Sequence, residues 1–330
     1  MSYDQECRKR LKTLIIMREF ERVIKDLANE KDENIQRVVD GAVHCATGEE
    51  AGELGVCLNL NKDDYVFSTH RGHGHAIAKG LELKRIFAEL MAKDTGVSGG
   101  MGGSMHLFDK ERGFMGGNGI VGGGVTVALG PAYASKYTGD GKVTVCFFSD
   151  GASNEGWCHE AMNMAALWKL PIVFVCENNL FAATTPSYKS LANPEIHERA
   201  KSYNMPGMVA DGNDLDDCIA VSKQAIDRAR AGEGPSLVEI KTYRWEGHCR
   251  VIEDLPIFRP QEVVDWWHER DCIKVYSNRL IEKGIITEEG VKEVWAEALK
   301  EIEEAVEFGR RSPRPDVNKF MTRIQERYAL

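Results

Sequence analysis

Four short polar segments of this chain contain the residue types that catalysis and ligand binding require. Each follows an apolar run, and the segments are Thr69–His75, Ser149–Gly156, Glu177–Asn179 and Trp245–His248. If those runs are strands of an open parallel sheet, the four segments meet at one edge, because ligands of such sheets bind outside the carboxyl ends of the strands. The sequence therefore predicts one site built from four separate parts of the chain.

Asp150 and Asn179 predict a site for a hard cation. Asp150 ends one apolar run and Asn179 follows the next, 29 residues later. A βαβ unit spans about 30 residues, so the two side chains are expected on adjacent strand ends. Oxygen ligands of this kind suit Mg²⁺, and the free N–H groups of a helix that begins at Gly151-Ala152 would favour a phosphate. An isolated Asp-Gly pair would favour a helix N-cap at Asp150 and a turn residue at Asn179, and the full run of polar residues reverses this preference.

The histidines at positions 70, 73 and 75 allow two interpretations. Imidazoles are good zinc ligands, so the group resembles part of a metal site. No Cys, Asp or Glu stands among them, and Arg71 lies within the group. This composition favours contacts with a phosphate or an oxyanion over a zinc site.

Glycine is concentrated in one block, with twelve glycines between Gly96 and Gly124. Within the block, Gly117–Gly122 satisfies the GxGxxG pattern of nicotinamide dinucleotide sites. That pattern should follow a strand, but Glu111–Met115 is not strand-like. The acid that binds the ribose should follow about 20 residues after the motif, but the next acid at a strand end is Asp150, 28 residues beyond the last glycine. A nicotinamide-dependent oxidoreductase is therefore the alternative from a different enzyme class, and backbone approach to a ligand is the favoured explanation of the block.

The elements that must position these residues are predicted from apolar periodicity. Helical spacing predicts a leading helix over residues 11–28 and a helix from Leu215 to about Arg230 with Asp214 as its N-cap. From Trp266 onward the chain is charged and helical. Strands are expected at Tyr65–Ser68, Val143–Phe148, Ile172–Cys176 and Ser236–Tyr243. Alternation of strands and helices predicts an α/β fold with a doubly wound, mostly parallel sheet.

Composition excludes several classes of protein. The 330 residues carry a formal net charge of −9 and no Lys/Arg run, which disfavours a nucleic-acid partner. Nine cysteines without CxxC spacing indicate reduced thiols and a cytoplasmic location. The longest uncharged stretch, Gly113–Ser135, holds eight glycines, so no membrane segment is expected.

The segment from Ser149 to Asn179 resembles the thiamine diphosphate motif in the alpha subunits of 2-oxo acid dehydrogenases. The matching residues are Ser149–Gly156, Glu160-Ala161, Asn163–Ala165, Leu167–Pro171 and Glu177–Asn179. The similarity extends from the first helix to the loop after His248. Within the family, four segments are most similar to the acetoin dehydrogenase alpha subunits: Thr69–His75, Ala78–Gly80, Gly102–His106 and Asn118–Gly124.

The resemblance implies a role for each matching residue. Magnesium would be bound by Asp150, Asn179 and the backbone carbonyl of Phe181. His44 and His73 would face the substrate in proton transfer and oxyanion stabilisation, and His248 would lie near the diphosphate and the acceptor route. The neighbours of thiamine diphosphate would be His70, Arg71, Gly151, Ala152 and His248 at the diphosphate, and the backbone of Gly119 and Val121 at the aminopyrimidine.

The chain departs from the family pattern at four places. Ser149 replaces a glycine, which would be strained only if the backbone required a positive φ. Ala42 replaces a bulky aromatic of pyruvate-specific relatives and leaves room for a larger substrate beside His44. Cys249 stands where animal pyruvate members carry a phosphorylated serine, and Arg250–Phe258, where lipoyl-partner recognition would be inferred, matches poorly.

The resemblance implies an alpha subunit that cleaves acetoin to acetaldehyde and passes the two-carbon unit to lipoamide on a transacetylase. Pyruvate or another 2-oxo acid is the alternative substrate, and a non-catalytic binding subunit is a third interpretation. Because the family takes an essential glutamate from a beta subunit, we expect an α₂β₂ heterotetramer and an inactive single chain. The predicted organisation is a helical lead-in over residues 1–40, a thiamine diphosphate-binding α/β domain over residues 41–265, and a helical tail over residues 266–330 that packs on the domain or on the partner subunit.

Overall fold

The computed structural model describes residues 2–31, 37–39, 41–249 and 259–328 of the chain. Its centre is a five-stranded parallel sheet with the strand order β1-β2-β3-β7-β6. The strands are β1 (Tyr65–Phe67), β2 (Thr144–Ser149), β3 (Ile172–Asn178), β7 (Ser236–Lys241) and β6 (Gly207–Asp211). All but β6 coincide with the predicted apolar runs, which confirms the parallel α/β fold.

Side chains of the central strands alternate between two hydrophobic cores. In β2, Val145 and Phe147 belong to the larger core, and Cys146 and Phe148 belong to the smaller one. A parallel sheet that is covered on both faces needs apolar residues at successive positions, and this is why the strands read as continuous apolar runs.

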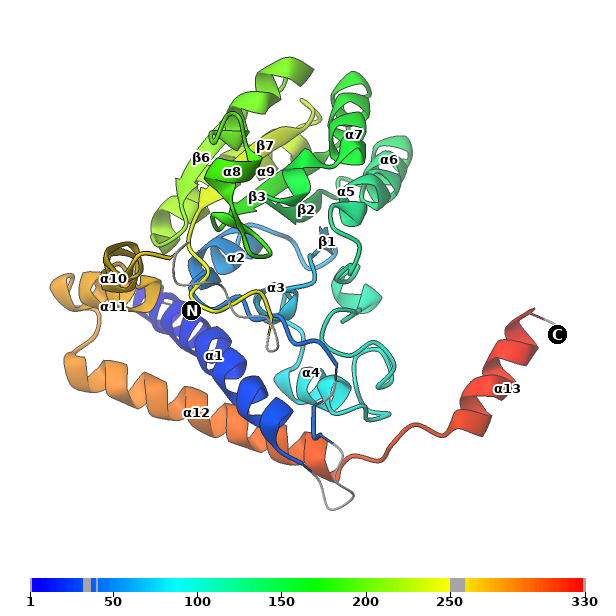
Figure 1. The fold of residues 1–330 in the computed structure, drawn as a ribbon, viewed down its shortest axis with the longest axis vertical. Helices are drawn as coiled ribbons and strands as arrows, with labels where there is room; N and C mark the ends of the chain where they lie inside the picture. Colours follow the sequence, from blue (N-terminus) through cyan, green and yellow to red (C-terminus); the bar gives the residue numbers. More distant parts are fainter. Residues whose placement is uncertain (1, 32–36, 40, 250–258, 329–330) are drawn as a thin grey trace.

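Helices cover both faces of the sheet (Figure 1). On the larger core lie α1 (Tyr3–Asn29), α2 (Glu50–Cys57), α3 (His73–Ala78), α4 (Leu83–Leu90), α9 (Leu215–Arg230), α11 (Cys272–Glu282) and α12 (Glu288–Arg311). On the smaller core lie α5 (Gly123–Val127), α6 (Leu129–Thr138), α7 (Gly156–Leu167) and the 3₁₀ segment η3 (Ile196–Tyr203). The sheet is therefore doubly wound, as the sequence predicts.

The chain reverses its direction across the sheet between β3 and β7. The connection from β2 to β3 runs through α7 on one face, whereas the connection from β6 to β7 runs through α9 on the other. In open α/β sheets such a reversal opens a crevice at the carboxyl ends of the strands, where ligands bind. The segments that follow β2, β3 and β7 are thus the expected place for a site.

The helix ends follow local rules of capping. The Asp214 side chain accepts hydrogen bonds from the backbone N–H groups of Asp216 and Asp217, which confirms it as the N-cap of α9. Ser2 and Gln5 form a capping box that starts α1 earlier than the predicted residue 11. In the described part of the chain, no helix is both long and apolar enough to cross a membrane.

Several elements differ from the sequence-based expectation. The edge strand β6, a hairpin of β4 (Phe181–Ala182) and β5 (Thr185–Pro186), and the short α8 (Ser187–Ser190), η1 (Lys110–Arg112) and η2 (Ala152–Asn154) were not predicted. The C-terminal helices begin with α10 (Gln261–Glu269), before Trp266. Helix α12 packs along α1 and α4, whereas α13 (Val317–Tyr328) stands away from the body of the molecule in Figure 1. The division at residues 40 and 265 remains a prediction.

Candidate active site

Asp150 and Asn179 lie at the carboxyl ends of neighbouring strands. Strand β2 pairs with β3 in a register that sets Ser149 beside Glu177, one and two residues before them. Asp150 is fully buried, and neither of its carboxylate oxygens receives a hydrogen bond of normal geometry from the described residues. Burial raises the pKa of Asp150 to about 6, against the lowering effect of the nearby Gly151 backbone and Arg244. A buried carboxylate with both oxygens unused is suited to bind a cation.

Asn179 is held in one orientation by a buried acid. Its side-chain Nδ2 donates to Glu49, 3.1 Å from Oε1, and its Oδ1 accepts from the backbone N–H of Phe181 at 3.2 Å. The amide oxygen is thereby directed away from Glu49. Asp150 and Asn179 supply hard oxygen donors, so the residues present fit Mg²⁺.

The turn after β2 is closely packed and begins a helix. A Cβ atom on Gly151 would lie 2.7 Å from Cβ of Ala182, so a side chain has no room at this position. Ala152 begins η2, which leads into α7. Ser149 is not among the described residues with positive φ, and its hydroxyl accepts from the N–H of Ala152 at 3.2 Å. Serine therefore fits here without backbone strain.

Three histidines from separate segments meet beside this turn. The ring centroid of His44 lies 4.8 Å from the ring centroid of His70 and 4.9 Å from that of His248. Burial, together with the charge of Arg71, lowers the pKa of His44 to about 3 and the pKa of His70 to about 2. Both imidazoles are consequently neutral near pH 7 and are available as hydrogen-bond donors and acceptors.

Arg71 links the segment that carries His44 to the segment that carries His248. Its guanidinium donates to the carbonyl of Cys45 at 2.6 Å and to the carbonyl of His248 at 2.8 Å, and it lies 3.3 Å from Nδ1 of His248. Burial lowers the pKa of Arg71 from its usual range. A buried guanidinium next to three imidazoles makes this corner of the site suited to an anion.

His73 is not part of this trio. It is fully buried, and both ring nitrogens have partners: Nδ1 lies 3.1 Å from Glu21 Oε2 and Nε2 lies 2.9 Å from the hydroxyl of Ser104. His75 is likewise bound between Ser68 and Glu177. The zinc interpretation of positions 70, 73 and 75 has no support, because their side chains serve three different sets of partners.

A narrow cleft joins the glycine block to the turn after β2. Its lining includes Gly122, Ser149 and three residues that the sequence assigned to one cofactor: His70, Val121 and Ala152. Gly119 stands in the sequence between two further lining residues, Asn118 and Ile120, and a Cβ atom on it would be 3.6 Å from the ring of His106.

The GxGxxG pattern lacks the context of a dinucleotide site. Gly117–Gly122 follows none of the strands of the described sheet, and the helix after it, α5, has five residues. Such a site needs a strand directly before the glycines and a helix N-terminus after them. The nicotinamide interpretation is therefore not supported.

Sequence reasoning missed the buried acids around the site. Glu49, Glu50 and Glu53 are buried on the first turns of α2, and burial with the neighbouring Glu177 raises the pKa of Glu49 to about 8. The available signal was a set of carboxylates within an otherwise apolar helix, which the linear pattern does not assign to partners.

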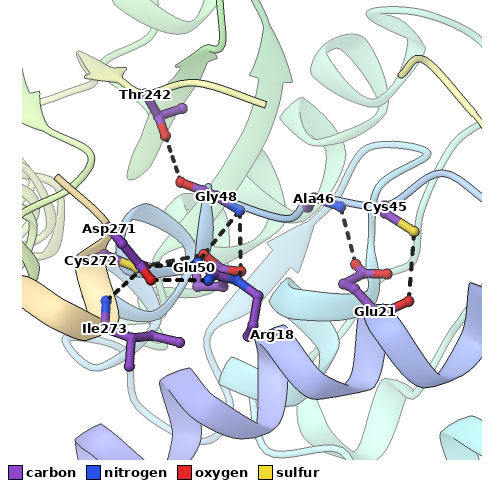
Figure 2. Close-up of polar contacts among 10 residues, drawn as sticks. All are labelled: Arg18, Glu21, Cys45, Ala46, Gly48, Glu50, Thr242, Asp271, Cys272 and Ile273. Atoms are coloured by element: carbon purple, nitrogen blue, oxygen red, sulfur yellow. Dashed lines mark hydrogen bonds and ion pairs between the residues drawn. The ribbon is translucent and has the colours of Figure 1, made fainter. Parts of the chain in front are cut away.

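Two acids hold the segment that carries His44 (Figure 2). Glu50 accepts from Arg18 at 2.5 and 2.9 Å and from the backbone N–H of Gly48 at 3.1 Å. Arg18 also binds Asp271 at the start of α11 and lies over the ring of Trp245. Glu21 of α1 accepts from the backbone N–H of Ala46 at 3.2 Å. The N-terminal helix therefore positions part of the site.

The chain is similar to one protein family over most of its length and to several named proteins. The model of the dehydrogenase E1 component family matches residues 16–318. The alpha subunit of acetoin:2,6-dichlorophenolindophenol oxidoreductase from Bacillus subtilis is 43% identical over 294 residues, which cover 89% of this chain and 87% of the relative. The pyruvate dehydrogenase E1 alpha subunit of Porphyra purpurea is 39% identical over 85% of this chain and 83% of its own length. A second acetoin:2,6-dichlorophenolindophenol oxidoreductase alpha subunit, from Cupriavidus necator, is 38% identical over 88% of this chain and 87% of its own length.

The family match and the relatives agree with the resemblance that the sequence motifs indicate. The relatives include both acetoin and pyruvate enzymes, so the substrate is not decided by similarity. The chain belongs to the dehydrogenase E1 component family, as an alpha subunit of thiamine diphosphate-dependent oxidoreductases.

Proposed function

We propose that the chain is the alpha subunit of an acetoin dehydrogenase that binds magnesium and thiamine diphosphate. The observation that carries the proposal is the buried Asp150 carboxylate, whose two oxygens are unused, beside the oriented amide of Asn179. These two side chains and the backbone carbonyl of Phe181 would hold the metal. Thiamine diphosphate, when bound, supplies the electron sink for carbon–carbon bond cleavage.

The protein's own groups bind and orient the reactants. His70, Arg71, Gly151, Ala152 and His248 would surround the diphosphate, where Arg71 supplies positive charge and Gly151 permits close approach. The backbone of Gly119 and Val121 would lie against the aminopyrimidine. His44 would serve proton transfer at the substrate as a neutral imidazole, with His248 beside it.

Acetoin is favoured over pyruvate by the environment of His44 and by similarity. Ala42, which is exposed, presents no bulk two residues before His44. The relative with 43% identity carries acetoin in its name. Pyruvate dehydrogenase is the second candidate, because relatives of that name reach 39 to 41% identity.

A beta subunit completes the enzyme in this proposal. Helices α6 and α7 expose four large apolar side chains on adjoining surface: Tyr133, Tyr137, Leu167 and Trp168. Leu167 is 75% exposed and Tyr137 is 83% exposed. An apolar surface of this kind marks a protein–protein interface, and we assign it to the beta subunit of an α₂β₂ assembly. The lipoyl-bearing transacetylase would accept the two-carbon unit; residues 250–258, where its recognition was expected, lie outside the described part of the chain.

The nine cysteines of the chain are all free, and we place the enzyme in the cytoplasm on that ground.

The test is reconstitution with the beta partner and comparison of turnover on acetoin, pyruvate and branched 2-oxo acids, with a dye as electron acceptor. We expect acetoin to be preferred, the alpha chain alone to be inactive, and Asp150→Ala to abolish the thermal stabilisation by magnesium and thiamine diphosphate. Preference for pyruvate would establish the second candidate, and sustained turnover by the alpha chain alone would refute the requirement for a partner. A double variant, Tyr137→Glu with Leu167→Glu, should prevent assembly in size-exclusion chromatography.

A further inference from the structure

Leu180 has a backbone conformation that leucine rarely adopts. Its φ is +71°, in the left-handed region, where the Cβ atom of an L-residue lies too close to the following carbonyl oxygen. Glycine has no Cβ atom and enters this region without strain. A strained residue persists only where the surrounding structure holds it, and such residues cluster at functional sites. Leu180 stands directly between Asn179 and Phe181, which supply two of the three proposed magnesium ligands.

Hydrogen bonds hold the backbone on both sides of Leu180. Its N–H donates to Oδ1 of Asn178 at 3.3 Å, and its carbonyl accepts from the N–H of Ser187 at 2.8 Å. Asn178 is itself fixed, because its Nδ2 donates to the buried Glu239 at 2.7 Å. Both backbone polar groups of Leu180 therefore have partners in the strained conformation.

The side chain of Leu180 packs against a buried aromatic cluster, which consists of Phe181, Tyr243 and Trp267. The rings of Tyr243 and Trp267 are stacked with their centroids 5.6 Å apart, and the ring of Phe181 lies edge-on to Tyr243. The guanidinium of Arg259 covers Phe181, 4.4 Å from its ring centroid. Contact with this cluster removes apolar surface of Leu180 from water, and this gain opposes the backbone strain.

The hairpin that follows Leu180 packs against the turn that carries the third proposed ligand. Gly151 directly follows Asp150, and a Cβ atom on Gly151 would lie 2.7 Å from Cβ of Ala182 in β4. Ala182 is only two residues after Leu180. A change of φ at Leu180 would therefore disturb this contact beside Asp150.

We infer that Leu180 is a positioning residue of the magnesium site, and that its side chain holds the backbone in the left-handed conformation that metal binding requires. Rotation about the φ of Leu180 would turn Asn179 relative to Phe181, because the two residues lie on opposite sides of that bond. The aromatic cluster opposes this rotation before the metal arrives, so binding does not have to supply the energy of the strain. The inference rests on the proposed function with magnesium and thiamine diphosphate.

The first test compares alanine and glycine at position 180 in the reconstituted tetramer, by calorimetric titration of Mg²⁺ in the presence of thiamine diphosphate. Leu180→Ala removes the packed side chain and keeps the strain, so the affinity for Mg²⁺ should fall about 10- to 100-fold. Leu180→Gly also removes the side chain, but glycine adopts a positive φ without strain. It should therefore bind Mg²⁺ about tenfold more tightly than Leu180→Ala does. A residue that served packing alone would give the opposite order, because glycine loses more contact than alanine.

Asn204 supplies the matched control. Its φ is +55°, but it ends η3 as an exposed residue and is not among the residues proposed for the site. Asn204→Ala and Asn204→Gly impose the same contrast on a left-handed backbone. Both should leave the affinity for Mg²⁺ within about twofold of the wild type.

The second test asks whether the aromatic cluster acts through Leu180. Trp267→Phe should lower the affinity for Mg²⁺ about fivefold when Leu180 is present, and by no more than about twofold in the Leu180→Gly background, where no side chain contacts the cluster. Leu180→Met keeps an apolar side chain of similar volume and should retain most of the affinity. Thermal unfolding of each metal-free tetramer verifies that the variants are folded.

The outcomes separate this inference from the proposed function. Wild-type affinity for Mg²⁺ in Leu180→Ala, or an affinity in Leu180→Gly no higher than in Leu180→Ala, would overturn the positioning role and leave the proposed function intact. A wild-type tetramer that binds no Mg²⁺ in the presence of thiamine diphosphate would overturn the proposed function, and the role of Leu180 with it.

Discussion

The side-chain amide of Asn179 donates to Glu49 Oε1 at 3.1 Å, across 130 positions of sequence. This bond determines the orientation of the amide, because Nδ2 is occupied by Glu49 and Oδ1 lies 3.2 Å from the backbone nitrogen of Phe181. Glu49 itself is buried at the start of α2. The buried acid thus positions an oxygen that the proposed metal would use.

Replacement of Glu49 should weaken magnesium binding although the residue is not a proposed ligand. We expect Glu49→Ala to lower the affinity for Mg²⁺ about 10- to 100-fold, the usual effect of losing a group that orients a metal ligand. Glu49→Gln keeps an oxygen acceptor in the same volume and should lose less. Calorimetric titration of Mg²⁺ in the presence of thiamine diphosphate measures both, and wild-type affinity in Glu49→Ala would contradict the positioning role.

Magnesium affinity should depend on pH through Asp150. Burial raises the pKa of this carboxyl to about 6, so a proton competes with the metal below that pH. The apparent affinity should rise from about pH 5 to 7, by up to about tenfold per pH unit on the acid side. Asp150→Asn should abolish binding, whereas Asp140→Asn, on an exposed loop, should keep the wild-type profile. A pH-independent wild-type affinity would refute the assignment.

The raised pKa of Asp150 has the opposite effect on the folding of the metal-free chain. A carboxyl whose pKa is raised in the folded state from 3.8 favours its neutral form there. Its contribution to the free energy of unfolding is present below the unfolded pKa and is lost as pH rises through about 6. Metal-free wild type should therefore lose stability relative to Asp150→Asn over this interval, which urea unfolding at several pH values can measure.

The parts of the site that the sequence predicts are those that depend on local order. The spacing of Asp150 and Asn179 equals one βαβ unit, so their approach follows from strand and helix lengths alone. Strand β6 was missed because it is a short edge strand in which only Ala210 is buried, and it shows no apolar run.

The parts that the sequence does not predict depend on contacts between distant segments. Glu21 meets His73 across 52 positions, and no pattern near either residue indicates the pair. His44 and His248 were associated through family resemblance, and their approach depends on Arg71 joining two loops. The carboxylates of α2 were not singled out in the sequence, because no linear pattern assigns them partners, and the whole helix is buried.

The partly buried His70 should make the chain sensitive to acid. Burial lowers the pKa of His70 to about 2, so an unfolded chain binds a proton at this residue below about pH 6.5 that the folded chain does not. The contribution to stability is present above the unfolded pKa and is lost as pH falls, by about 1.4 kcal/mol per pH unit. His70→Gln should flatten the dependence of the free energy of unfolding on pH by this amount between about pH 4 and 6. If the free energy of unfolding fell equally with pH in His70→Gln and in the wild type, a neutral imidazole at His70 in the folded chain would be contradicted.

Gly48 should tolerate a side chain poorly. Its φ is +100°, and a Cβ atom would lie 2.5 Å from the carbonyl of Tyr243 and against the ring of Trp245. Since Trp245 leads to His248, Gly48→Ala should displace a site segment as well as strain the backbone, at a cost of about 3 kcal/mol in the free energy of unfolding. Gly130→Ala is the control, because Gly130 lies in the exposed part of α6 with nothing within 4 Å of its Cβ position, and alanine there should stabilise the helix by up to about 1 kcal/mol. Urea unfolding of both variants measures the difference, and equal stabilities would show that the loop at Gly48 adapts to a side chain.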